Sequence, residues 1–208
     1  MKNALLLVAL AILPCTTQAG ILGGVDPFTG DLSEGFNSVD TGFTNPIRVF
    51  DDTATLSGDF GIVTNNWGFV STIRAFEGQL MYGAAGGPAN FLFDTAIGKF
   101  GGYFGTNVVN STTDAADAIA NFYDVNNSLI GTHSILLANG GTWTWSGFQS
   151  TTDNIKRIEI VGATHGGGLV QMDALEASRL TSTVVPEPST ALSLGIGLLG
   201  LFFTRRRR

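Results

Sequence analysis

The stretch Ile155-Lys156-Arg157-Ile158-Glu159-Ile160-Val161 contains the clearest structural pattern of the chain. In Ile158-Glu159-Ile160 apolar and charged side chains alternate, and residues two positions apart lie on one face of a β-strand. The segment Trp143-Thr144-Trp145 shows the same alternation. Such segments predict strands that bury one face and present polar groups on the other.

Other segments rich in Val, Ile, Phe, Trp and Thr are separated by Gly, Asn and Asp, which is typical of short strands. A helical signal competes only near 113–120, where β-branched neighbours oppose it. About ten short strands in one domain predict an all-β fold, a β-sandwich of jelly-roll type with two packed sheets. We expect strands at 47–50, 60–64, 68–73, 79–82, 90–93, 99–106, 118–124, 129–137, 142–148, 155–161 and 169–177.

The N-terminus has the pattern of an export signal. Lys2 precedes an apolar run of about ten residues, roughly half of what spans a bilayer as a helix. Small residues at Thr17 and Ala19 occupy the positions that signal peptidase reads, so we expect cleavage between Ala19 and Gly20. Residues 1–19 are therefore a predicted signal peptide.

The C-terminus, residues 185–208, combines Pro186-Glu187-Pro188, an apolar run and the block Arg205-Arg206-Arg207-Arg208. Arginines resist transfer across a bilayer, so they predict a stop-transfer signal that stays cytoplasmic. The 16 residues 189–204 measure about 24 Å as a helix, somewhat short of a bilayer core of about 30 Å. This short transmembrane helix favours transient insertion in the inner membrane over permanent anchoring.

In motif, order and position, this end resembles the PEP-CTERM sorting tail of exported bacterial proteins, also known as the ice-binding protein C-terminal domain. The resemblance implies that exosortase, a membrane peptidase, recognises Pro186, Glu187 and Pro188. It also implies that the product is released or transferred to the cell surface or extracellular matrix. The chain shows no repeated Thr-x-Thr ladder of the kind that would suit ice.

A second resemblance concerns the middle of the chain. Several segments are similar in order to the cargo domain of many PEP-CTERM proteins, itself similar in outline to carbohydrate-binding jelly rolls. The last strand of that domain usually has a second acidic residue where this chain has Ala174. The matching segments are Gly101-Gly102-Tyr103-Phe104-Gly105, Asn121-Phe122-Tyr123-Asp124, Leu129-Ile130-Gly131-Thr132, Trp145-Ser146-Gly147-Phe148, Ile155-Lys156-Arg157-Ile158-Glu159-Ile160 and Met172-Asp173-Ala174-Leu175.

Residues 20–184 have the length of one domain. The only cysteine, Cys15, lies in the predicted signal peptide, so the exported domain has neither disulfides nor thiol chemistry. This domain has six basic and sixteen acidic residues, a net charge of about −10. Such a surface repels phosphate backbones and excludes nucleic acid as a partner class.

Motifs of common enzyme sites are absent from the sequence: there is no Gly-x-Ser-x-Gly elbow, His-Glu-x-x-His or phosphate-binding Gly-rich loop. His133 lies in a strand pattern and is predicted to be a packed or edge residue, whereas His165 lies in a Gly-rich loop. We therefore expect no catalytic residues and no enzyme activity, with a hydrolase as the least favoured class.

Two kinds of binding residue remain as candidates. Trp143 and Trp145 share a strand face, where they would form either the centre of the sandwich or a stacking platform for sugar rings. We favour burial for them, and for Phe104, Phe122 and Phe148, since a domain without disulfides needs its large apolar groups inside. Trp67, beside Asn66, is the aromatic residue we expect to be exposed and to contact ligand.

Acids near Asp51, Asp52 or Asp173 are candidate oxygen ligands for structural calcium, and no other cofactor is expected. Taken together, the sequence predicts an exported protein that signal peptidase and exosortase process. Its sandwich would have a non-catalytic structural or binding role at the cell surface or in the extracellular matrix. The alternative is a carbohydrate-binding module that acts on extracellular polysaccharide.

Overall fold

The structure is a computed structural model, and all regular elements in its described residues are β-strands. None of these residues belongs to a helix, and hence none to an apolar helix of membrane-spanning length. The all-β, two-sheet fold class expected from the sequence is confirmed. The described residues are 20–64, 75–84, 87–106, 117–138, 142–151, 154–162 and 169–179.

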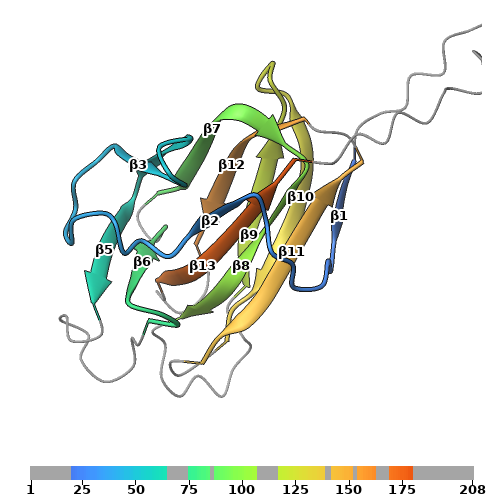
Figure 1. The fold of residues 1–208 in the computed structure, drawn as a ribbon. Helices are drawn as coiled ribbons and strands as arrows, with labels where there is room; N and C mark the ends of the chain where they lie inside the picture. The colour runs from blue at the N-terminus through green and yellow to red at the C-terminus, as the bar shows by residue number, and fades with distance from the viewer. Residues whose placement is uncertain are drawn as a thin grey trace, which may run out of the picture.

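One sheet has seven strands in the order β1-β11-β8-β13-β6-β5, with β2 also paired to β13. Figure 1 shows β1 in blue beside β11, and the chain after β1 crossing over this sheet toward β2. The strands are β1 (Ile21–Gly23), β2 (Leu32–Glu34), β5 (Phe60–Thr64), β6 (Gln79–Gly83), β8 (Lys99–Thr106), β11 (Thr144–Ser150) and β13 (Val170–Ser178).

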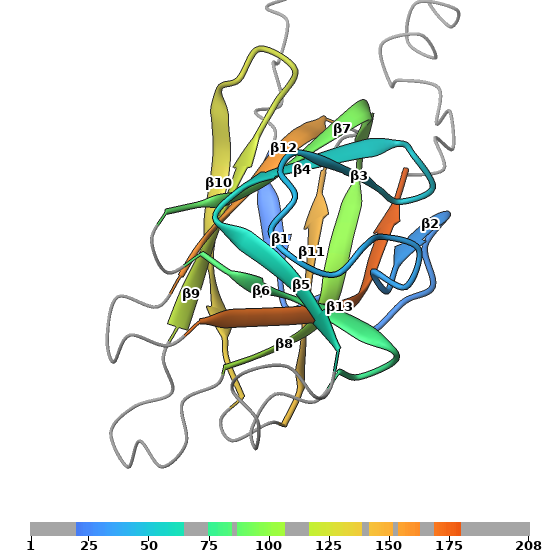
Figure 2. The ribbon, with the colours of Figure 1, turned by 90° about the vertical axis from the view of Figure 1, so that its left-hand side faces the viewer.

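The other sheet has six strands in the order β10-β9-β12-β7-β4-β3. Every strand pairing in both sheets is antiparallel, and the chain passes from one sheet to the other between β7 and β8 and again from β10 through β13. Such crossings are typical of a jelly-roll sandwich, and Figure 2 shows the two layers after a quarter turn. The strands are β3 (Ile47–Val49), β4 (Ala54–Gly58), β7 (Ala89–Ile97), β9 (Asp117–Tyr123), β10 (Leu129–Leu136) and β12 (Ile155–Val161).

Most expected strands within the described residues are confirmed, and those at 60–64, 99–106 and 155–161 have the expected bounds. The sequence did not predict three strands, β1, β2 and β4, because they are short or built from small residues. The helical signal near 113–120 is wrong for Asp117–Ala120, which pair with β10 and β12 as part of β9. The expected strand at 68–73 lies outside the described residues.

Phenylalanine rings fill the space between the sheets. Phe91 of β7 meets Phe100 of β8 with ring centroids 5.9 Å apart, and Phe122 of β9 meets Phe148 of β11 at 5.0 Å. Each buried phenylalanine contributes about 1.5–3 kcal/mol through removal of apolar surface from water. The expected burial of Phe104, Phe122 and Phe148 is confirmed.

A buried carboxylate fixes the chain where it enters the core. Glu34, at the end of β2, accepts hydrogen bonds from the backbone N–H of Phe36 at 2.5 Å and of Phe50 at 2.6 Å. Both phenylalanines have positive φ and fully buried side chains. Positive φ is unfavourable for a bulky residue, so the two hydrogen bonds and the ring packing stabilise these turns.

Truncation of one central ring tests this account of the core. We expect Phe100→Ala to lower the free energy of unfolding by about 3–5 kcal/mol, because the substitution leaves a cavity against Phe91 and Phe93. Leu136→Ala, at a residue that is 52% exposed on β10, should change stability by about 0.5 kcal/mol or less. Denaturant titration of both variants measures the difference, and equal losses would contradict the assigned core.

Candidate binding site

Two glycines allow the indole of Trp145 to lie against the outer face of the seven-stranded sheet. Trp145 on β11 lies opposite Tyr103 on β8, on the face directed away from the phenylalanine core. A Cβ atom on Gly101 would lie 2.6 Å from Cζ2 of the indole, and one on Gly147 would lie 2.8 Å from its Nε1 atom. Any side chain at these two positions would therefore displace the indole.

Four aromatic residues on this face are in continuous contact, and we call Phe28, Trp145, Tyr103 and Phe76 the aromatic row. The ring centroids of Phe28 and Trp145 are 5.7 Å apart, and those of Trp145 and Tyr103 are 5.4 Å apart, both edge-on. Phe76 stacks on Tyr103 at 4.1 Å with an interplanar angle of 12°. Phe76 is 48% exposed, and the other three rings are half-buried.

The chain between β1 and β2 fastens one end of the row. Nε1 of Trp145 donates a hydrogen bond of 2.9 Å to the carbonyl oxygen of Val25. The backbone N–H of Val25 donates a hydrogen bond of 3.1 Å to the carbonyl oxygen of Gly147. The ammonium of Lys99 lies 5.5 Å from the ring centroid of Phe28, close enough for a cation–π interaction. These contacts hold Phe28 and Trp145 in fixed relative positions.

Asp173 fastens the other end. Its carboxylate accepts a hydrogen bond from the backbone N–H of Glu77 at 3.0 Å and from that of Ala174 at 2.7 Å. A β-bulge follows Asp173 in β13, with Ala174 at a φ of 45°. The side chain of Asp173 is fully buried, and it joins the sheet to the loop that presents Phe76.

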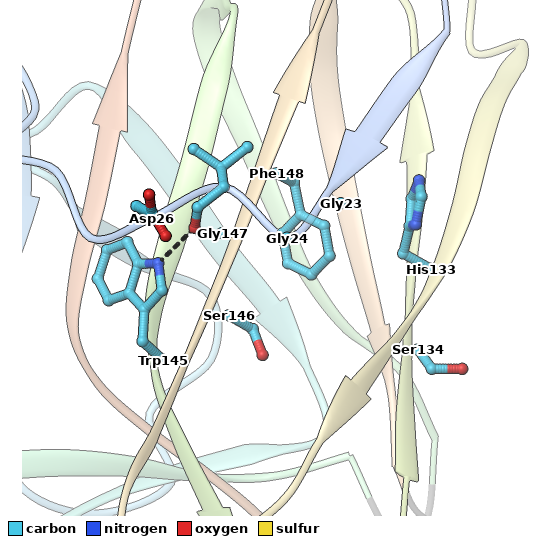
Figure 3. Close-up of a pocket in the computed structure, with 10 residues that line it drawn as sticks. Gly23, Gly24, Asp26, His133, Ser134, Trp145, Ser146, Gly147 and Phe148 are labelled. Carbon is cyan, nitrogen blue, oxygen red and sulfur yellow. Dashed lines mark hydrogen bonds between the residues drawn. The ribbon is translucent and has the colours of Figure 1, made fainter.

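A pocket of about 700 Å³ opens beside Trp145, at the edge of the sandwich between β10 and β11. Figure 3 shows Asp26 next to Trp145 on one side of this pocket and His133 with Ser134 on the other. Ser146 also lines it. The pocket is therefore lined by a carboxylate beside the indole, and by two hydroxyls and an imidazole.

His133 is packed, as the sequence predicted. Its ring lies 6.3 Å from that of Phe122 and 5.8 Å from that of Phe148. Its Nε2 atom is 2.8 Å from the carbonyl oxygen of Ile21, which requires Nε2–H to donate. This nitrogen is therefore engaged in holding β1 to β10.

The three acids proposed for calcium have different surroundings. Asp51 and Asp52 are exposed in the turn between β3 and β4, and Asp52 forms a 2.6 Å ion pair with Arg48. Asp173 is buried and binds backbone N–H groups. In the described part of the chain no three His, Cys, Asp or Glu side chains are grouped to hold a metal ion. The calcium hypothesis at these residues stays a prediction.

Several sequence-based site assignments lie outside the described residues: Asn66, Trp67, Ala19, Pro186, Glu187, Pro188 and Arg205, Arg206, Arg207 and Arg208.

The expected burial at the sandwich centre is wrong for both Trp143 and Trp145. Trp145 lies on the outer face, and half-buried Trp143 packs against a separate cluster of Val63, Leu80 and Tyr82.

Sequence analysis assigned no binding role to Phe28, Phe76 or Tyr103. Phe28 and Phe76 lie in loops, where no periodicity marks an aromatic residue that folds back onto the sheet. Gly101 and Gly147 are the sequence signal that could have indicated this site, because glycine inside a strand often marks close approach by another group.

The buried Asp173 predicts a specific dependence of stability on pH. Burial raises the pKa of Asp173 to about 6, although hydrogen bonds from the backbone N–H groups of Glu77, Ala174 and Phe76 lower it in part. The native state then binds more protons than the unfolded state between about pH 4 and pH 6. Stability should therefore fall as pH rises through this window, by up to about 3 kcal/mol.

Asp173→Asn should reduce this slope without abolishing it, because burial also raises the pKa of Glu34. Denaturant titrations from pH 4 to pH 7 measure the slope. Asp40→Asn, a loss of one negative charge at an exposed position, is the matched control and should keep the wild-type slope. An unchanged slope in Asp173→Asn would show that other groups cause the pH dependence.

Comparison with solved structures gives similarity at low sequence identity. The CBM22-1 xylan-binding domain of Paenibacillus barcinonensis Xyn10C has 12% identity and a TM-score of 0.40, covering 74% of this chain and 99% of that domain. The CBM22-1-CBM22-2 tandem of the same protein has 12% identity and a TM-score of 0.41, covering 79% and 50%. A family 29 carbohydrate-binding module, CBM29-2, has 11% identity and a TM-score of 0.34, covering 60% and 94%.

No curated protein matches the chain. Residues 184–208 match the family described as the PEP-CTERM protein-sorting motif. This match confirms the resemblance seen in Pro186-Glu187-Pro188, the apolar run and the terminal arginines. The chain therefore has a C-terminal signal for export and sorting to the cell surface.

Proposed function

We propose that this protein is an exported, non-catalytic β-sandwich that binds extracellular polysaccharide at the bacterial cell surface. The aromatic row on the outer face of the seven-stranded sheet is the observation that carries the proposal. It leads from the exposed Phe76 to Trp145, beside the pocket at the sandwich edge.

Sugar rings have apolar C–H faces and polar hydroxyl edges, and the site offers partners for both. An aromatic ring provides a flat apolar surface with little loss of conformational entropy on binding. Asp26, Ser134 and Ser146 line the pocket and provide hydrogen-bonding groups for hydroxyls. This combination of an apolar surface with a few oriented polar groups suits a glycan.

The absence of catalysis is part of the proposal and is supported by the roles of the described polar groups. The carboxylates of Glu34 and Asp173 bind backbone N–H groups, and His133 is held against Ile21. Glycoside hydrolysis requires two carboxylates that face each other across the scissile bond. Glu34, Asp173 and His133 are thus engaged in stabilising the fold, and Asp26 is the one carboxylate among the described residues that line the pocket.

The terminal segments provide the route to the surface. In this proposal signal peptidase cleaves before Gly20, residues 189–204 insert transiently in the inner membrane, and Arg205–Arg208 keep the end of the chain cytoplasmic. Exosortase then cleaves near Pro186-Glu187-Pro188, after which the sandwich is released or attached to the surface. Sorting and binding are thus assigned to different parts of the chain.

Loss of the exposed ring tests the binding proposal. Phe76→Ala should weaken binding to the best polysaccharide of a soluble panel roughly two- to tenfold, since an aromatic contact contributes about 0.5–1.5 kcal/mol. The double variant with Trp145→Ala should lose roughly tenfold or more. Affinity electrophoresis against the panel measures the change, with melting curves to confirm that both variants are folded.

Leu92→Ala is the matched control, because Leu92 is 44% exposed on β7 of the other sheet, close to the exposure of Phe76. It should bind like the wild type. Failure of the wild type to bind any glycan would overturn the proposal in favour of a purely structural role. Equal binding by the folded double variant would place the site elsewhere.

A separate experiment tests the tail. Replacement of Arg205–Arg208 by Ser, or of Glu187 and Pro188 by Ala, should block removal of the tail and leave the sandwich folded. The first change removes the stop-transfer charges, and the second removes the motif that the peptidase is expected to read. Pulse-labelling in an exosortase-positive host follows processing, with Leu136→Ala as a variant that should mature normally. Normal tail loss from both tail variants would show that this segment is only an anchor.

A further inference from the structure

We infer that the ligand is an uncharged polysaccharide chain that lies along the aromatic row and ends in the pocket beside Trp145. This inference rests on the proposed function and adds a ligand class and a path. It follows from the distribution of charge around the row and from the order of the rings across the sheet.

Three acidic residues lie at or near the two ends of the row. Asp26 lines the pocket at one end, and Glu77 directly follows Phe76 at the other. Asp173 lies below the loop that presents Phe76. The ammonium of Lys99 lies over the ring of Phe28, where the cation–π interaction engages it. A glycan with carboxylate, sulfate or phosphate groups would therefore meet like charge along this path.

Most cationic side chains that the structure describes lie elsewhere. Arg48 of β3 pairs with Asp94 at 2.5 Å, and Arg157 of β12 pairs with Glu159 at 2.9 Å, both on the six-stranded sheet. Arg157 also lies 3.6 Å from the ring centroid of Tyr123. These arginines are therefore committed to the opposite sheet.

The path follows from the order of contacts. Phe76 lies on Tyr103, Tyr103 meets Trp145 across neighbouring strands, and Trp145 forms part of the pocket wall. A ligand that uses both Phe76 and the pocket must extend across β8 and β11. In the pocket, Asp26 accepts hydrogen bonds from neutral hydroxyls but repels a carboxylate. Because the path extends across two strands, affinity should increase with the number of sugar units.

The experiment compares polymers that differ in charge. Binding of the whole exported chain is measured in chelator at two salt concentrations. The neutral polymers are hydroxyethylcellulose, xylan and galactomannan, and the acidic polymers are carboxymethylcellulose, alginate and polygalacturonate. We expect at least one neutral polymer to bind at both salt concentrations. The acidic polymers should bind at least tenfold more weakly than this neutral polymer at low salt. Their affinity should recover in part at high salt, because salt screens repulsion.

Oligosaccharides of one to six units from the neutral polymer that binds test the path by calorimetry. Affinity should increase with length in the wild type, and Phe76→Ala should remove the gain from the longest oligomers. Leu92→Ala, on the opposite sheet, should keep the full length dependence. Equal affinity for a single sugar and for six units would overturn the extended path.

The outcomes separate this inference from the proposed function. Preferential binding of acidic polymers would overturn the uncharged ligand while leaving polysaccharide binding intact. Acidic-polymer binding that disappears in the folded double variant Phe76→Ala and Trp145→Ala would assign charged glycans to this site. Failure to bind any polymer would overturn both proposals.

Discussion

Burial of phenylalanine between two sheets is the constraint on which the rest of the structure depends. The only cysteine, Cys15, lies ahead of the domain, so no disulfide can hold the sandwich together. Seven phenylalanines are among the largest fully buried side chains. Because the space between the sheets is occupied by these rings, a large ligand must bind on an outer face or at an edge.

The two outer faces differ in a way that favours one as a binding surface. On the six-stranded sheet, Arg157, Tyr123 and Glu159 contact one another in a polar network. On the seven-stranded sheet, Gly101 and Gly147 leave room for the indole of Trp145. The first face satisfies its own polar groups, whereas the second presents rings in a row. This difference explains why the seven-stranded face is the better candidate.

The irregular backbone of β13 connects the fold to the site. A regular strand would not produce the register shift after Asp173, nor the positive φ of Ala174. The bulge allows the buried carboxylate to bind the loop of Phe76. Bulges commonly redirect side chains near functional sites. A buried acid with a raised pKa therefore positions an exposed aromatic residue.

The sequence by itself determined the strand class of most segments, because period-two alternation in segments such as Ile155–Val161 reports one buried face. It also identified the sorting tail, whose motif, apolar run and arginines are contiguous. Only the tertiary structure decided which face Trp145 occupies, since alternation gives two faces without saying which one meets the second sheet. The aromatic row was likewise decided by folding, because Phe28 and Phe76 reach the sheet from loops, and such contacts between distant residues leave no local pattern.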